Sequence, residues 1–381
     1  MAFVTANVSV DGQPLKRTYV EHTGPGGIGS LGFAMTDQNG SFTFDASFIA
    51  NHVDIKVYCQ NSVIRVLDGG TLVPLPVYQQ FAAVGNGDAV SIGQQKDHFK
   101  IMARALDVYD IVWRQFRPYN NSNRQAFPLG QRSSIRDTFA DSRRIELSYP
   151  DNMPQPLAFS EPAGLGNSGY PLVHIKDRAM DGRLFGEADA KAPQHDASLL
   201  PHELGHAFHF SAMAAGTRLS IEAQYIGFIA THIANPYHQV DKPTTPFVAF
   251  IEAAGIFSER FFAFAKQVAP GQSGVGLRQA FFRDELGPQS LAGVLVDPYT
   301  NVGRRNAAGA VVPVLTNNDV EGAVYGAVYL DFASRVGLKE AVGLVVDSNA
   351  TSFAEFRQYV LGRGNAAWTT AINAVRATWR M

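Results

Sequence analysis

The sequence has very little cysteine, since Cys59 is the only one in 381 residues. A single thiol excludes an internal disulfide framework and any metal site built from several cysteines. Charged residues are also scarce, at 17%, and the net charge is −2. There is no run of lysine or arginine that would bind a phosphate backbone. We therefore expect no nucleic-acid partner.

Two kinds of hydrophobic segment are missing as well. The N-terminal stretch MAFVTANVSVDGQPL lacks the charged region and the apolar region of a secretory signal peptide. No apolar run approaches the length that spans a bilayer. The sequence predicts a protein without a membrane span. Such a protein stays in the cytoplasm, has had a signal removed, or leaves the cell by a route that needs no signal peptide.

The composition of the chain is typical of a globular protein. Hydrophobic residues make up 46% of the sequence, and the length favours two or three domains. Within residues 1–80, short alternating runs such as ANVSV, SFTFDA, VDIKVYC and SVIRVLDG are separated by the turn sequences DGQP and DQNGS. This pattern is typical of a small all-β domain. Residues 81–97 follow as a linker or a last strand.

The order of these strand and turn sequences is similar to that of a known family. The sequence V-x-V-D-G-Q-P-L, followed by T-D-Q-N-G-S-F-T-F, resembles prealbumin-like domains such as the regulatory modules appended to carboxypeptidases. The resemblance implies that residues 1–80 form a β-sandwich. In that family the module scaffolds or binds and performs no chemistry.

The pattern changes near His98. One helix is expected over 98–116, and extended segments are expected in the region up to residue 177. From residue 196 onward the periodicity is almost wholly helical. The expected helices are 197–215, 219–234, 246–268, 276–284, 318–336, 338–346, 351–361 and 365–379. We predict a multidomain α+β protein in which 98–381 is one domain, with a sheet-containing part, 98–215, and a helical part, 216–381. A chain of residues 98–381 is expected to fold alone.

The stretch LLPHELGHAFHF, residues 199–210, contains the main candidate site. His202 and His206 are four residues apart, so both lie on one face of a helix. Two imidazoles so placed can bind one metal ion. Glu203 lies beside them and can accept a proton from a water on the metal. This HExxH arrangement predicts a zinc site with Glu203 as general base.

The same stretch resembles the active-site helix of the gluzincin metallopeptidases, and above all the oligopeptidases with H-E-x-G-H-x-x-H. The resemblance implies a zincin-type catalytic domain, a supporting role for His209, and a third zinc ligand that is a glutamate on a later helix. Three glutamates are candidates: Glu222, Glu252 and Glu259.

We predict Glu252 as the third ligand. Its surroundings, FIEAAGIFSE, are similar to the oligopeptidase pattern F-V-E-A-P-S-Q-x-x-E, and Gly255 allows a close approach of helices. If the metal helix ends near Gly216, a helical hairpin would leave Glu222 roughly 10 Å from His206 along the axis. Glu259 lies two turns beyond Glu252 and is the candidate for orienting one of the histidines.

The segment NNDVEGAVYGAVYLDFASRVG, residues 317–337, resembles the helix that these families place after the ligand helix. There the oligopeptidases carry tyrosines that hydrogen-bond the oxyanion. The resemblance implies this role for Tyr325, and Tyr329 lies one turn further on. Aromatic residues four apart are equally typical of core packing.

The sequence thus predicts a zinc-dependent peptidase that acts on peptides or proteins. The alternatives are a non-catalytic binding or adhesion protein, an inactive peptidase homologue, or a protease delivered into another cell to cleave one protein. Cleavage preference, the choice between endopeptidase and exopeptidase, and the oligomeric state stay open.

Overall fold

The computed structural model describes residues 3–27, 29–45, 52–61, 63–69, 75–116, 145–151, 159–162, 171–175, 199–213, 215–231, 243–285, 318–379 and 381. The chain divides into two compact units. The first comprises Met1–Tyr109, Pro118–Phe159 and Tyr170–Asp196, and the second comprises Asp110–Arg117, Ser160–Gly169 and Ala197–Met381. The architecture is mixed α+β with several small sheets, as the sequence predicts.

The first sheet is organised around one strand of the first unit. Strand β1 pairs in parallel with β10 and antiparallel with β2 and β5. The bounds are Phe3–Val10 for β1, Gln13–Pro14 for β2, Ser41–Asp45 for β5 and Ala89–Ile92 for β10. Every second side chain of β1 is buried, from Val4 to Val10, because alternate residues of a strand face the same side.

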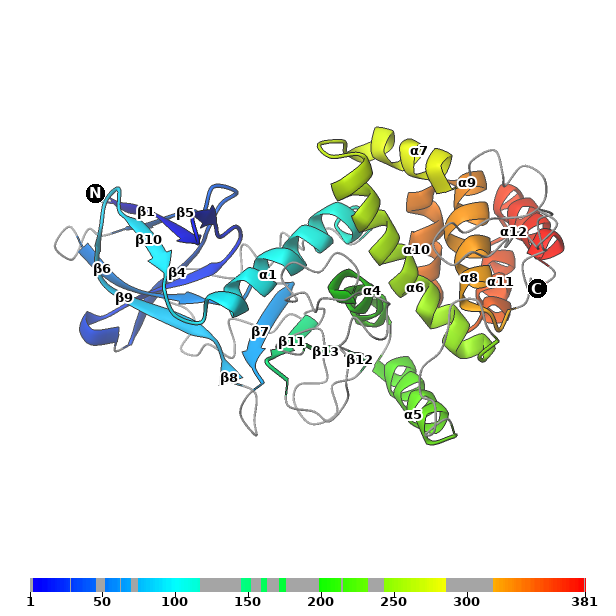
Figure 1. Ribbon diagram of the computed structural model, residues 1–381, viewed down its shortest axis with the longest axis horizontal. Coiled ribbons are helices and arrows are strands. Elements are labelled where there is room, and N and C mark those ends of the chain that lie inside the picture. Colours follow the sequence, from blue (N-terminus) through cyan, green and yellow to red (C-terminus); the bar gives the residue numbers. More distant parts are fainter. Residues whose placement is uncertain are drawn as a thin grey trace, which may run out of the picture. The chain divides into compact units, whose positions relative to one another are not determined.

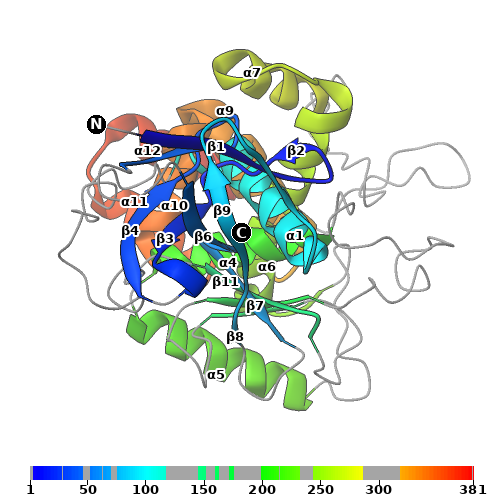
Figure 2. The same ribbon diagram turned by 90° about the vertical axis from the view of Figure 1, so that its left-hand side faces the viewer.

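The second sheet is antiparallel, with its strands in the order β4-β3-β6-β9 (Figure 2). The bounds are Tyr19–Thr23 for β3, Ser30–Met35 for β4, His52–Tyr58 for β6 and Tyr78–Gly85 for β9. This sheet contacts the first one where β9 meets β1 and where β4 meets β5. The segment 81–97 therefore contains the end of β9 and all of β10, so much of it is strand.

A third sheet joins distant parts of the sequence. Strand β7 (Ile64–Asp68) pairs in parallel with β11 (Ile145–Tyr149), which pairs in parallel with β13 (Leu172–His174). Helix α1 (Lys96–Val108) packs on β7, and β8 (Leu75–Pro76) pairs with its other edge. A boundary at 81–97 would cut through this sheet, because the run SVIRVLDG pairs with a strand far beyond it.

The second unit is helical (Figure 1). Its helices are α4 (Leu199–Ala212), α5 (Ala215–Thr231), α6 (Pro246–Ala263), α7 (Gly274–Glu285), α8 (Glu321–Tyr325), α9 (Ala333–Val336), α10 (Leu338–Ser348), α11 (Phe353–Gly362) and α12 (Ala366–Trp379). π-helical turns extend α6 over 264–268 and connect α8 to α9 over 326–332. Strand β12 (Phe159–Glu161) is the edge strand of the third sheet, next to β13. None of the described helices combines the length and the apolar character needed to cross a membrane.

Helix α6 is the central element of this unit and packs against α4 and α8. The side chain of Thr245 caps its first turn by accepting a hydrogen bond from the Val248 amide at 3.1 Å, and Pro246 stands at the first helical position. Nearly all of its side chains are buried, including those of Glu252 and Glu259. A buried carboxylate needs charged or hydrogen-bonding partners. The partners of Glu252 and Glu259 must therefore lie on elements that pack close to α6.

The helix that carries the HExxH motif ends earlier than the sequence predicts. Helix α4 stops at Ala212, and α5 begins at Ala215. Gly216 therefore lies in the first turn of α5 and does not end α4. Glycine is common after helix ends, but α4 stops four residues before this one.

Candidate metal centre

Helix α4 carries the two histidines of the HExxH motif on one face. The Nε2 atoms of His202 and His206 are 3.1 Å apart, as the four-residue spacing predicts. The rings are nearly perpendicular, with centroids 4.8 Å apart. His206 is buried and His202 is partly exposed. Both imidazoles thus direct a nitrogen at the same point.

Glu252 of α6 completes a triangle with them. Its Oε2 atom lies 3.1 Å from His202 Nε2 and 3.2 Å from His206 Nε2. These three residues form the potential metal-binding group found among the described residues. In a tetrahedral zinc site with bonds of 2.0–2.1 Å, ligand atoms are separated by about 3.3 Å. The triangle has that size, and two imidazoles with a carboxylate are a donor set that suits zinc.

Two glycines allow α4 and α6 to come this close. A Cβ atom on Gly205 would lie 2.7 Å from the carbonyl oxygen of Ala254 and 2.9 Å from the Cα atom of Gly255. A Cβ atom on Gly255 would lie 2.7 Å from His202 Nε2 and 2.8 Å from His206 Cε1. The helix contact and the space for the imidazoles therefore both depend on the absence of side chains.

Glu259 lies on the other side of His202, where the sequence predicts an orienting residue. Its Oε2 atom is 3.3 Å from His202 Nδ1. Burial alone would lower the pKa of His202, but hydrogen bonds to Glu252 and Glu259 outweigh it and raise that pKa well above its ordinary value. Two carboxylates around one imidazole thus favour a positive charge at this position. A bound metal ion would supply such a charge.

His206 is held differently. Its Nδ1 atom is buried and has no hydrogen-bond partner among the described residues. Its ring instead stacks on Phe210, with centroids 6.1 Å apart and an interplanar angle of 18°. One histidine is therefore oriented by a carboxylate and the other by aromatic packing.

Glu203 is fixed by a residue that the sequence did not single out. The hydroxyl of Ser160 lies 3.0 Å from Glu203 Oε2 and 2.8 Å from the Glu203 carbonyl oxygen. Burial raises the pKa of Glu203, while His206 and His202 act in the opposite direction. Ser160 lies in β12, 43 residues before Glu203, so no local spacing points to it.

Tyr225 is the second residue that sequence reasoning missed. It lies on α5, and its hydroxyl donates a hydrogen bond of 2.9 Å to Glu252 Oε1. Burial and then the nearby Glu252 raise the pKa of Tyr225 well above its usual value, so the hydroxyl keeps its proton. The available signal was the helical spacing of Ile221, Glu222 and Tyr225, of which the first two are buried and Tyr225 is half-buried.

Other predicted residues have different surroundings. Glu222 is buried on α5 and is not part of the three-residue cluster found among the described residues. The ring of His209 packs against Phe210 and Phe250. The hydroxyl of Tyr325 donates to Glu285 at 3.3 Å, within a buried network that also contains Arg260. An oxyanion role for Tyr325 stays a prediction.

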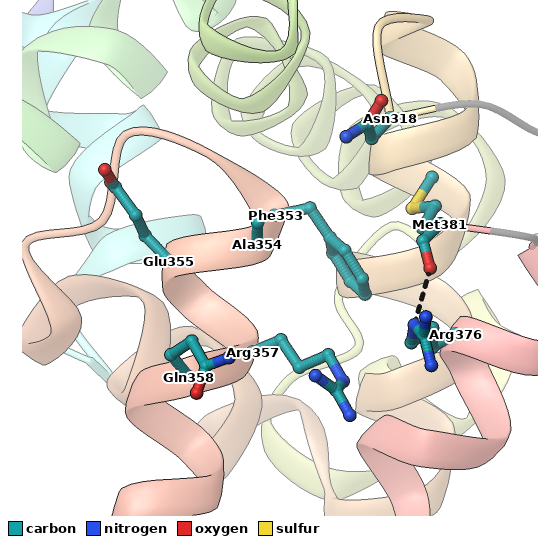
Figure 3. A pocket seen from close by; sticks show the side chains of 8 residues that line it. All are labelled: Asn318, Phe353, Ala354, Glu355, Arg357, Gln358, Arg376 and Met381. Atoms are coloured by element: carbon teal, nitrogen blue, oxygen red, sulfur yellow. Dashed lines mark hydrogen bonds between the residues drawn. The ribbon is translucent and has the colours of Figure 1, made fainter.

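A pocket of about 540 Å³ lies elsewhere in the second unit (Figure 3). Its lining residues are Asn318, Phe353, Ala354, Glu355, Arg357, Gln358, Arg376 and Met381. None of them belongs to the metal cluster. Arg357 donates to Asn373, and Arg376 donates to the main-chain oxygen of Met381. We assign this pocket no part in the chemistry of the cluster.

Comparisons with known proteins identify no family. No protein-family model and no curated protein matches the chain. One solved structure that is similar is a 9R-lipoxygenase from Cyanothece PCC8801, at 11% sequence identity and a TM-score of 0.20. The alignment covers 94% of this chain and 66% of the lipoxygenase chain. A TM-score of this size carries no argument about fold or function.

Proposed function

We propose that the chain is a zinc-dependent peptidase with a zincin-type catalytic domain. His202, His206 and Glu252 would hold the zinc ion. The observation that carries the proposal is the triangle of their ligand atoms, with sides of 3.1, 3.1 and 3.2 Å. Three protein ligands leave a fourth position of a tetrahedral ion open, which distinguishes catalytic from structural zinc sites.

The chemistry follows from the residues around that position. When bound, zinc would lower the pKa of a water molecule and polarise a substrate carbonyl. Glu203 accepts the proton as the water oxygen bonds to the peptide carbonyl carbon. The proton then passes to the amide nitrogen as the carbon–nitrogen bond breaks, so the carboxylate is regenerated. Ser160 holds Glu203 in place for both transfers.

The N-terminal sheets have a separate role in this proposal. We infer that they form a prealbumin-like β-sandwich that scaffolds the enzyme or binds its substrate. Peptides or proteins are the proposed substrates. The proposed catalytic residues all lie outside the N-terminal sheets, so the sheets are not required for the proton transfers themselves.

Metal analysis of the purified protein, combined with a mixed-peptide cleavage profile, tests the proposal. We expect about one zinc per chain, removable by a chelator, and cleavage of peptides. His206→Ala should lower zinc occupancy at least tenfold, because it removes a ligand. Full occupancy in that variant would refute the metal site.

Glu203→Gln separates catalysis from binding, because glutamine keeps the shape of the side chain but cannot accept a proton. Zinc should stay bound while hydrolysis falls by about 100-fold or more. Near wild-type cleavage would exclude Glu203 as the base. A zinc-loaded wild type that cleaves nothing in a broad peptide library would favour a non-catalytic binding protein.

A further inference from the structure

The two oxygens of Glu252 have different partners. Oε2 faces both imidazoles, at 3.1 Å from His202 and 3.2 Å from His206. Oε1 accepts the hydrogen bond from the Tyr225 hydroxyl at 2.9 Å. The carboxylate is therefore oriented with one oxygen toward the metal position and the other toward α5.

We propose that Tyr225 is a positioning residue that makes Glu252 bind the metal through one oxygen only. The inference rests on the proposed function, because it concerns the same zinc site. A carboxylate can coordinate a metal with one oxygen or with both. If both oxygens of Glu252 coordinated, they would occupy the position that a catalytic zinc site keeps for water or substrate. The hydrogen bond from Tyr225 occupies Oε1 and so keeps that position open.

Tyr225 is itself held in place by the helix that carries Glu252. Its ring packs edge-to-face on Phe247, with centroids 5.1 Å apart and an interplanar angle of 70°. Phe247 lies in the first turn of α6, five residues before Glu252. The hydroxyl and the carboxylate are thus tied to one rigid element. A hydrogen-bond partner can orient a metal ligand only if the partner is itself fixed. Tyr225 meets this condition for Glu252.

Tyr225→Phe tests the proposal, since it removes the hydroxyl and keeps the ring against Phe247. Zinc affinity should fall about 10–100-fold, the usual effect of losing a residue that orients a metal ligand. In the cobalt-substituted protein, the visible absorption should weaken, because a second Glu252 oxygen raises the coordination number. Tyr359→Phe on α11 is the matched control and should change neither quantity.

Unchanged zinc affinity and an unchanged cobalt spectrum in Tyr225→Phe would overturn the proposal. X-ray absorption of the wild-type zinc protein tests the same point without a variant, because the zinc–carbon distance separates one-oxygen from two-oxygen carboxylate binding. Two-oxygen binding in the wild type would also overturn it. These metal readouts need no hydrolysis, so a wild type that binds zinc but cleaves nothing contradicts the proposed function alone. A wild type that binds no zinc contradicts both.

Discussion

Replacing Gly255 by alanine should damage the proposed metal site more than the fold. The new methyl group would lie 2.7 Å from His202 Nε2, and 2.8 Å from both His202 Cε1 and His206 Cε1. These separations are about 1 Å shorter than ordinary carbon contacts of 3.5–4.0 Å. The atoms that must move are the tips of the imidazole rings, which carry the proposed zinc-binding nitrogens. Movement on that scale removes the nitrogens from bonding distance.

Two opposing effects determine how much Gly255→Ala changes the stability of the metal-free protein. Alanine in a helix interior is more favourable than glycine by about 1 kcal/mol. Overpacking of a core costs about 1–3 kcal/mol, and the lower part of this range applies where side chains can move aside. For Gly255→Ala the two nearly cancel, so stability of the metal-free protein should change by less than about 1 kcal/mol. Zinc affinity should fall tenfold or more.

Gly205→Ala should have the reverse effect and damage the fold more than the proposed metal site. Its methyl group would meet the Ala254 carbonyl oxygen and the Gly255 Cα atom, which are backbone atoms and cannot rotate away. The full overpacking cost then applies, and a net loss of about 1–2 kcal/mol is expected. Gly343→Ala in α10, where a Cβ atom meets nothing within 4 Å, should be neutral or stabilising.

Competition with a chelator for zinc and urea unfolding of the metal-free proteins measure the two quantities separately. Wild-type zinc affinity in Gly255→Ala would show that the imidazoles do not need this space. A large loss of metal-free stability in the same variant would place the damage in the helix contact and not in the metal site.

Two further variants test residues that orient the site. Ser160→Ala should keep zinc bound and lower the turnover number roughly tenfold, since a hydrogen bond to a charged group is worth about 1.5–3 kcal/mol. Ser160→Thr, which keeps the hydroxyl, should restore most of the activity, and an unchanged turnover number in Ser160→Ala would exclude the role. Glu259→Gln should weaken zinc binding about 10–100-fold through loss of the charged partner of His202, measured by chelator competition. Equal affinity in Glu259→Gln and wild type would mean that packing alone orients this histidine.

Local periodicity explains why the helical unit could be predicted from sequence. Apolar residues recur at helical spacing, and Thr245 with Pro246 marks the start of α6, so the expected bounds are close to the observed ones. The predicted end of α4 was wrong, because the helix stops at Ala212, where no glycine marks its end. A residue-by-residue pattern also cannot show which strands pair. The run that forms β7 alternates as an N-terminal strand would, yet its partner is β11.

The same limit applies to the site. His202 and His206 are related by a fixed spacing within one helix, and the sequence therefore predicts their proximity. Glu252 follows from a short pattern on a second helix and from the need for close helix packing. Ser160 and Tyr225 approach the carboxylates from other elements, through single hydrogen bonds over 43 and 27 residues. No periodicity encodes such contacts, so they emerge only from the tertiary structure.

The pairing of β7 with β11 leads to a last prediction, which reverses the expectation that residues 98–381 fold alone. Removing residues 1–97 deletes the strand that pairs with β11 at five positions and covers α1. Ile145 and Leu147 on β11 and Phe99 on α1 are fully buried. Exposing three such side chains would cost about 5–9 kcal/mol, which is comparable to the whole stability of a domain, about 5–15 kcal/mol.

The freed edge of β11 would also offer unpaired backbone groups next to apolar side chains, which favours aggregation. The 98–381 chain should therefore be insoluble when expressed alone. Co-expression of a separate 1–97 chain should recover soluble protein, because β7 is then supplied by the second chain. A soluble, monomeric 98–381 protein with the expected helical circular dichroism and about one bound zinc would refute this reasoning. That result would mean that β11 keeps its place without β7, through its pairing with β13.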